Sequence, residues 1–373
     1  MSRSWRSDDS EKWTYGFGDG SDGDLTISSN TTETVIDSSC SGTAGSTSLS
    51  ATNASFAAGQ LILIHQTRGT GVGQWELAKI SAYTAGTITT DINLQFTYTD
   101  SGASQAQVRV LKQHNNVTIN SGVTYTAKAW DGNVGGLIGW FAKGTTTVTG
   151  TITAVDKGFR GGSSAINNAS GTFQGEGSSG AGAASNIAAN GSGGGGTDSA
   201  GASGGGGNGT AGVDGVGGSG NGVGGTTAGN ATLTLLSLGG SSGGSSASAT
   251  AVNGSNGAGI VLIISSVTVI TGSINLNGSN GGTTAFANAG GSSGGSCLIK
   301  GVTITLGSNL ISATSSTGGS QNGWTGGAGG VGRIHLDYSG SYTGTTSPTI
   351  DVTLDATIIE GGSSNSSSFF LLF

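Results

Sequence analysis

The chain has 373 residues, of which 76 are glycine, one is proline and only 9% are charged. Such a composition is unlike that of disordered chains, which combine low hydrophobicity with high charge and abundant proline. The net charge of −7, and the absence of Lys and Arg between Arg160 and Lys300, argue against a nucleic-acid surface, which needs cations to neutralise phosphates.

Residues 1–23 are expected to form an N-terminal arm. The arm leads into DGSDGD, which holds the carboxylates of Asp19, Asp22 and Asp24. A calcium loop of the EF-hand type needs oxygen ligands at alternating positions, and here Ser and Gly fill those positions. The sequence therefore favours a polar turn ahead of the first strand over a metal site.

Residues 24–130 are expected to form an N-terminal β domain. Apolar and polar residues alternate with a period of two in LILIH (Leu61–His65) and VTIN (Val117–Asn120), and turn-forming residues interrupt these runs. The sequence thus predicts an all-β protein. His65 and His335 alternate with apolar neighbours and are expected to be half-exposed, and neither they nor His114 belong to a recognisable catalytic triad.

Residues 131–350 are expected to form a stacked glycine-rich β array. Three segments share the order glycine entry, apolar strand, Thr/Val strand, glycine turn, short strand and glycine-rich exit. They are Gly135–Gly162, Gly257–Gly282 and Gly294–Gly319, and a degenerate fourth copy begins at Gly326–Tyr338. One such unit cannot cover its own apolar face, so neighbouring units are expected to stack as in a β-solenoid.

The first repeat is followed by an insertion, Ser163–Asn256, that contains the glycine run Ser192–Gly225. This run is either a tether or a folded block of extended, left-handed glycine helices, in which each N–H bonds to a neighbouring helix. We predict the folded block, because long unstructured loops are uncommon inside compact domains. Val213, Val216 and Val223 are expected to be spaced contacts against a flat surface.

Residues 351–373 are expected to form a C-terminal strand and an apolar tail. Five large apolar side chains end a polar chain: Phe369, Phe370, Leu371, Leu372 and Phe373. An exposed tail of this kind would aggregate, so it is expected either to complete its own fold or to pair with an open edge of a neighbouring subunit. No apolar run is long enough to predict a membrane-spanning helix.

Two stretches carry a family resemblance. GGSCLIKGVTITLGSNLISATSSTGG and GGAGGVGRIHLDY resemble the glycine-rich repeats of large bacterial surface proteins, with matching positions at Gly294–Leu298 and Gly329–Ile334. The long glycine runs are similar to those of the poly-glycine sandwich adhesins at phage tail-fibre tips. The resemblance implies a non-enzymatic, extracellular adhesive or structural part.

Several single positions are candidate sites. Trp324, in the turn NGWTGG, is a candidate glycan contact, because indole offers a flat apolar face with a polar edge; the alternative is that it covers the end of the strand stack. Cys40 and Cys297 either pair or remain separate buried thiols. Asn-x-Ser/Thr sequons are candidate glycosylation points, although chance explains many of them in so Ser/Thr-rich a chain. They occur at Asn30, Asn53, Asn116, Asn168, Asn190, Asn208, Asn230, Asn253, Asn277 and Asn365.

The leading functional expectation is a non-enzymatic subunit of an extracellular or virion fibre that binds copies of itself through its termini, with no cofactor and no metal. One alternative is a receptor-binding tip of a phage tail fibre, whose partner is a cell-surface glycan or protein. The other is a glycan-processing β-solenoid enzyme, for which Asp156, Lys157 and Arg160 form the best local cluster of ionisable groups.

Overall fold

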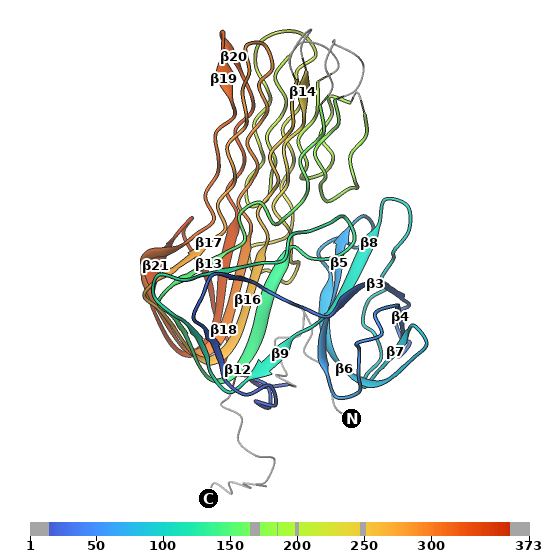
Figure 1. Ribbon diagram of the computed structural model, residues 1–373, viewed down its shortest axis with the longest axis vertical. Helices are drawn as coiled ribbons and strands as arrows, with labels where there is room; N and C mark the ends of the chain where they lie inside the picture. Colours follow the sequence, from blue (N-terminus) through green and yellow to red (C-terminus); the bar gives the residue numbers. More distant parts are fainter. Residues whose placement is uncertain (1–14, 165–171, 185, 198–200, 247–250, 359–373) are drawn as a thin grey trace, which may run out of the picture.

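The computed structural model describes residues 15–164, 172–184, 186–197, 201–246 and 251–358. They form a closed β-barrel, a parallel β-solenoid beside it, and a long bundle of glycine-rich segments that extends away from both (Figure 1). The prediction of an all-β chain with a stacked β array is confirmed. We refer to the barrel and solenoid together as the base, and to the far end of the bundle as the tip.

The strands outside the solenoid belong to the barrel and to the bundle. The barrel closes in the order β3-β4-β7-β6-β5-β8. Its strands are β3 (Asp37–Gly42), β4 (Ser48–Ala51), β5 (Leu61–Arg68), β6 (Trp75–Thr84), β7 (Thr87–Thr90) and β8 (Gln105–Val110). The bundle contains two short antiparallel pairs, β14 (Ser245–Ser246) with β15 (Ala251–Val252) and β19 (Ser320–Gln321) with β20 (Trp324–Thr325).

The solenoid is a stack of parallel turns. Its strands are β1 (Leu25–Ile27), β2 (Thr31–Thr32), β9 (Lys112–His114), β10 (Val117–Ile119), β11 (Thr124–Thr126), β12 (Leu137–Val148), β13 (Thr151–Thr153), β16 (Ile260–Ile270), β17 (Ser273–Asn275), β18 (Ser296–Ser312), β21 (Arg333–Ser347) and β22 (Asp351–Leu354). One ladder crosses six turns through Leu25, Val117, Thr146, Thr268, Ile304 and Tyr342. The predicted repeats therefore stack as neighbours, and β1, β2 and β9 to β11 add two turns before them.

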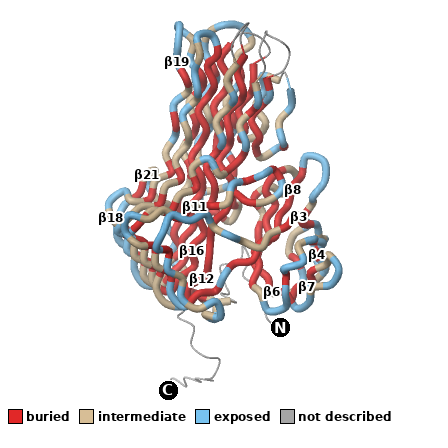
Figure 2. Tube along the Cα trace, in the orientation of Figure 1, coloured by how far each residue is buried: buried red, intermediate tan, exposed pale blue. Residues whose placement is uncertain are grey.

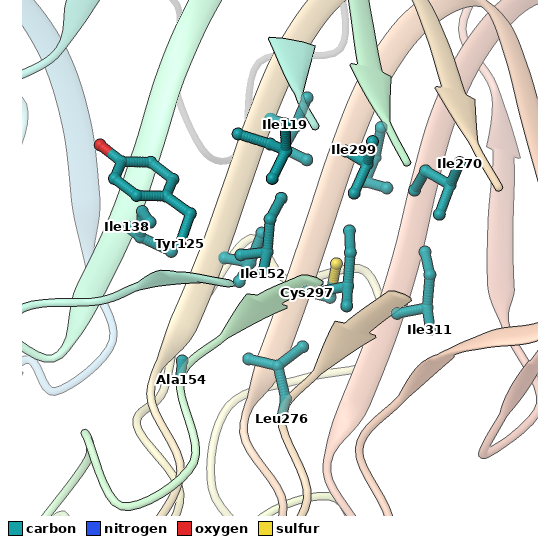
Figure 3. Close-up of a cluster of buried hydrophobic side chains, with 14 of the residues drawn as sticks. Ile119, Tyr125, Ile138, Ile152, Ala154, Ile270, Leu276, Cys297, Ile299 and Ile311 are labelled. Atoms are coloured by element: carbon teal, nitrogen blue, oxygen red, sulfur yellow. The ribbon is translucent and has the colours of Figure 1, made fainter. Parts of the chain in front are cut away.

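Each solenoid turn has three sides around one apolar core. On β12, a register irregularity between Ala142 and Thr145 separates the first side from the second, and a glycine turn leads to the third, which contains β13. Side chains such as Ile152, Ile270 and Ile299 point inward and are fully or almost fully buried (Figure 3). Side chains along a strand point alternately inward and outward, so every second residue contributes to the apolar inner face of a turn.

A second core joins the barrel to the outside of the first solenoid side. Leu63 and Trp75 of the barrel pack in the same cluster as Leu137, Leu262 and Leu298 of the solenoid. Because these strands bury residues on both faces, their sequences are continuously apolar and do not alternate. The barrel has its own, third core.

In the bundle, backbone hydrogen bonds take the place of an apolar core. Within Ser203–Gly207, residues three apart bond to the same neighbouring segment. Ser203 N donates to Asn288 O (3.1 Å) and Gly206 N to Gly291 O (3.0 Å). A repeat of three residues is that of an extended polyproline-II-like helix, here with its amides free to bond laterally. The predicted polyglycine-type segments are therefore present.

The segment Ser203–Gly207 lies at the centre of the bundle, and its backbone bonds to six neighbouring segments. These are 192–195, 212–213, 222–225, 240–243, 288–291 and 327–330. A Cβ on Gly204 would collide with the carbonyl oxygen of Val223, and one on Gly206 with that of Gly240. Glycine is required here because the backbones touch, and Figure 2 shows these segments buried along the bundle.

The described parts of Ser192–Gly225 are folded, as predicted, but the role expected for the three valines is wrong. Val213, Val216 and Val223 are 53%, 62% and 42% exposed, respectively. Their segments lie on the outside of the bundle. In a helix with three residues per turn, the outward position of an outer helix has room for a large side chain, whereas buried side chains of the bundle, such as those of Ser203 and Ser241, are small.

Candidate functional site

The tip of the bundle consists of short turns (Figure 1). The hairpin β19–β20 pairs Gln321 with Trp324, and Asn322 occupies its turn with a φ of 55°. Asn and Gly tolerate this left-handed conformation better than other residues, which accounts for the sequence Asn322-Gly323. The turn Asn-Gly therefore closes the hairpin and places Trp324 opposite Gln321.

Two further turns are joined to this hairpin. The Asn322 side chain donates to the carbonyl of Ala285 in the turn Thr283–Asn288. On the other side, Val216 and Thr325 exchange two backbone hydrogen bonds of 2.8 Å. The tip is thus one connected surface built from segments that are far apart in the sequence.

Apolar side chains are exposed on this surface. Phe286 is 55% exposed and Val216 is 62% exposed, whereas Trp324 is half-buried and packs over Gly217. Trp324 therefore both covers the end of a segment and leaves part of its indole in solvent. Phe286 was not singled out from the sequence, although a lone aromatic in the polar run TTAFANAG was the available signal, and Val216 was expected to be covered.

Both described ends of the chain lie at the base (Figure 1). Tyr15 packs against the core between barrel and solenoid, and Ile358 is buried in that same core. The tip is therefore the end of the molecule that lies away from both. The candidate assembly residues Phe369–Phe373 lie outside the described residues, as do the sequons at Asn168 and Asn365.

A buried ionic cluster joins the bundle to the base. Glu176 of the bundle forms ion pairs with Arg68 of the barrel and with Arg160, and it accepts a hydrogen bond from Trp130 Nε1 (3.0 Å). The carboxylate is 1% exposed. Arg160 is thus held by Glu176, and no bond joins it to Asp156 among the described residues. The cluster is built to hold two parts of the molecule together.

A second buried cluster lies on β18, β21 and β22. His335 bonds to Asp351 (2.8 Å) and to Asp337 (2.9 Å), and Lys300 forms an ion pair with Asp337. Burial lowers the pKa of Lys300 although Asp337 opposes this. Burial acts to raise the pKa of Asp337, but the hydrogen bond from His335 and the charge of Lys300 outweigh it, so the pKa of Asp337 is lowered.

The expectation that His65 and His335 are half-exposed is wrong, because each is 1% exposed. Both lie on strands covered on two faces, so alternation with apolar residues does not indicate exposure there. His65 Nε2 donates to the carbonyl of Leu236 (2.9 Å), and burial lowers the pKa of His65 to about 4. His114 likewise has a lowered pKa because of burial.

Two carboxylates of the acidic turn DGSDGD bond to residues of the neighbouring solenoid turn. Asp22 pairs with Lys112 and accepts from the backbone N–H of Gln113 (2.7 Å), and Asp24 accepts from the backbone N–H of Asn116 (3.0 Å). These bonds fasten the turn to the next solenoid turn. No group of three or more metal-ligating side chains occurs in the described ranges.

The remaining candidate positions are structural or surface features. Cys40 and Cys297 are both free and buried, one in the barrel core and one in the solenoid core, and burial raises the pKa of Cys297 to about 12. Asn208 is fully buried and donates to the carbonyl of Gly294 (2.9 Å), so its sequon is inaccessible in the folded chain. Asn30, Asn116 and Asn253 are exposed, and Asn53, Asn190, Asn230 and Asn277 are half-buried.

Comparisons with known proteins leave the family open. No protein-family model matches the sequence, and no curated protein matches it. Among solved structures, the chain aligns with the tailspike protein gp49 from Pseudomonas phage LKA1 at 11% identity and a TM-score of 0.20, over 87% of this chain and 51% of the tailspike. The alignment thus spans about half of the tailspike's length, and a similarity this low carries no functional argument. In the described ranges, no helix has the length and apolar character needed to cross a bilayer.

Proposed function

We propose that this protein is a non-enzymatic adhesin of a cell or virion surface. In this proposal the base is the attachment end, the glycine bundle is a rigid shaft, and the tip turns contact the target. The expected target is a cell-surface glycan or protein. The protein acts outside the cell.

The position of the first and last described residues supports this proposal most directly. Because Tyr15 and Ile358 both pack against the core of the base, covalent or non-covalent attachment at either end leaves the tip free. Phe286, Val216 and Trp324 supply exposed apolar surface on a shaft otherwise rich in Gly, Ser and Thr. Aromatic side chains are common anchors for sugars and for proteins.

The test is binding of the labelled full chain to a panel of bacterial cells and to a glycan array. Trp324→Ala combined with Phe286→Ala should reduce binding at least about tenfold, the loss expected when anchor residues are truncated. The matched control is Val352→Ala, an exposed apolar residue of the base that is 36% exposed. Unchanged binding by the tip variant, or an equal loss in the control, would contradict the proposal.

A fibre subunit is the second candidate. It is favoured by the edge strand β22, where Val352 and Leu354 are 36% and 64% exposed. Exposed apolar edge strands pair readily with other chains. Electron microscopy of the purified protein distinguishes the two candidates, because a fibre subunit forms open-ended filaments whereas a tip adhesin forms monomers or small closed oligomers.

The proposal of a non-enzymatic role rests on how the buried carboxylates are used. Glu176 and Asp337 each form an ion pair with a buried Arg or Lys partner. Carboxylates held in this way are poor proton donors or nucleophiles. Turnover assays with common bacterial and algal glycans test this, and activity abolished by Asp156→Ala would contradict it.

A further inference from the structure

The outer surface of the solenoid differs sharply between its first and second sides. On the first side, outward residues such as Leu137, Leu262 and Leu298 are buried against the barrel. On the second side, the outward residues of the same strands β12, β16 and β18 face solvent and are almost all Thr or Val. Neither the fold nor the proposed adhesive tip explains this second composition.

The outward residues of the second side form two straight columns across six turns. The first column contains Asp24, Asn116, Thr145, Val267, Thr303 and Ser341. The second contains Thr26, Thr118, Thr147, Val269, Thr305 and Thr343. All these residues are exposed or half-buried, whereas the residues between the columns are buried in the four inner turns, such as Thr146 and Thr268, and half-buried at the two ends, Leu25 and Tyr342.

The columns form a regular two-dimensional net. Register is continuous from Thr145 to Val148 and through the paired residues of β16, β18 and β21, because the irregularities lie before Thr145 and after Thr305. Neighbouring turns are about 4.8 Å apart, and positions two residues apart along a strand are about 6.6 Å apart. The side chains thus repeat in both directions with the spacing of the backbone.

In the four turns from β12 to β21, all eight side chains on this net are uncharged, and all except Ser341 are the β-branched Thr or Val. Thr and Val are β-branched and have few χ1 rotamers, so little conformational entropy is lost when they contact an ordered surface. Thr and Val are also nearly isosteric, so the turn with Val267 and Val269 keeps the same methyl positions. Asp24, in the first turn, is the one ionised group of the two columns.

A trough of about 340 Å³ runs between the columns over the first three turns. Its lining includes Thr26, Thr118, Thr145 and Thr147. The four threonines bring methyl and hydroxyl groups to it, and Asp24, Leu25 and Asn116 complete the lining. Methyl groups favour cage-like ordering of the neighbouring water, and hydroxyl groups can bond to that water.

From this arrangement we infer that the second solenoid side binds ice. The oxygen atoms on a face of hexagonal ice form a rectangular net of dimensions comparable to those of the two Thr/Val columns. Water ordered over the methyl groups and anchored by the hydroxyls would join that net at many points at once. An ionic surface would keep its own tightly bound water instead, which is why the uncharged composition matters.

The experiment measures ice-crystal shape, thermal hysteresis and inhibition of ice recrystallisation with the full chain. The wild-type protein should facet ice crystals and inhibit recrystallisation. Thr147→Lys combined with Thr305→Lys should need at least about tenfold more protein for the same inhibition, because a charge would be buried against the lattice. Thr147→Val combined with Thr305→Val should stay within about twofold, since the methyl positions remain.

The matched control places the same charges on the third solenoid side, as Thr126→Lys with Ser312→Lys, both half-buried positions. This control should retain wild-type inhibition, and thermal melts should show that all variants fold. No effect of the wild-type protein on ice, or an equal loss in the control, would overturn the inference. Binding to insoluble chitin or cellulose that is lost in the Thr147/Thr305 lysine variant would also overturn it, by assigning this side to a polysaccharide.

Discussion

The bundle and the solenoid are built from the same chain but are held together by different forces. In the solenoid, side chains such as Ile263 and Ile299 fill an apolar core, and backbone hydrogen bonds join neighbouring strands of one sheet. In the bundle, Gly206 has no side chain to bury, and its N–H and C=O bond to two different neighbouring segments. One region depends on apolar surface removed from water, and the other on close backbone contact.

This comparison shows that glycine richness does not by itself indicate a tether. Glycine loses more conformational freedom on folding than any other residue, so a folded glycine segment must recover that free energy. It does so here because each central segment has neighbours on all sides that satisfy its polar groups. Where backbones touch, as at Gly204 and Gly206, the bundle is consequently intolerant of a side chain, whereas its outer positions tolerate large ones.

The largest effect is expected where the two regions are joined. Glu176→Ala should lower the free energy of unfolding by about 3–5 kcal/mol, because it leaves the buried Arg68 guanidinium without its partner. Denaturant unfolding measures this. The control Lys79→Ala removes the exposed pair with Asp19 (3.7 Å) and should cost less than about 1 kcal/mol. Similar losses of unfolding free energy in the two variants would mean that the ion pairs of Glu176 do not hold the bundle to the base.

The next effect tests the close contact of backbones. Gly206→Ala should destabilise the protein by about 3 kcal/mol, because its Cβ would collide with the carbonyl of Gly240. Hydrogen exchange should show amides of 203–207 that are protected for hours in the wild type and lose this protection in the variant. In the control Gly180→Ala, the new Cβ would lie 3.5 Å from Ala103 Cβ, so the change should stay within about 1 kcal/mol. Rapid exchange of these amides in the wild type would contradict the packed bundle.

A smaller effect on the free energy of unfolding is expected in acid, and it arises from His65 in the base. Burial lowers the pKa of His65 to about 4 from an ordinary value of 6.5, so the unfolded chain binds the proton more tightly. Stability is therefore lost as pH falls, by about 2 kcal/mol between pH 7 and pH 5. Urea unfolding at both pH values measures this, and His65→Gln should remove most of the difference. A slope unchanged in that variant would assign the acid sensitivity to another group.

The smallest effect is expected on the outside of the bundle. Val213→Thr replaces a side chain that is 53% exposed on an outer segment. Its free energy of unfolding should change by less than about 0.5 kcal/mol, as for most surface substitutions. Thermal melts compared with those of Gly206→Ala would show the contrast between outward and inward positions. A large loss would mean that this valine is covered in solution.

Much of the fold could be predicted from local sequence patterns. Alternation in VTIN and in the strands around Gly150 and Gly272 identifies the solenoid turns, because a strand's two faces follow from a period of two. The glycine entries and exits mark where the strands pass into the bundle. The exposure of His65 and Val213 was predicted wrongly, because it depends on which other segments cover that strand or helix.

The sequence by itself determined the all-β class, the stacked repeats and the need for the glycine runs to fold, since these depend on residues close together in the chain. Tertiary structure alone decided that the tip unites Val216, Phe286 and Trp324, and that Ser203–Gly207 has six neighbours. It also decided which solenoid side the barrel covers and which it leaves open. The physical reason is that lateral hydrogen bonds and buried surfaces join residues far apart in the chain, such as His65 and Leu236 with a separation of 171, and no local pattern specifies these partners.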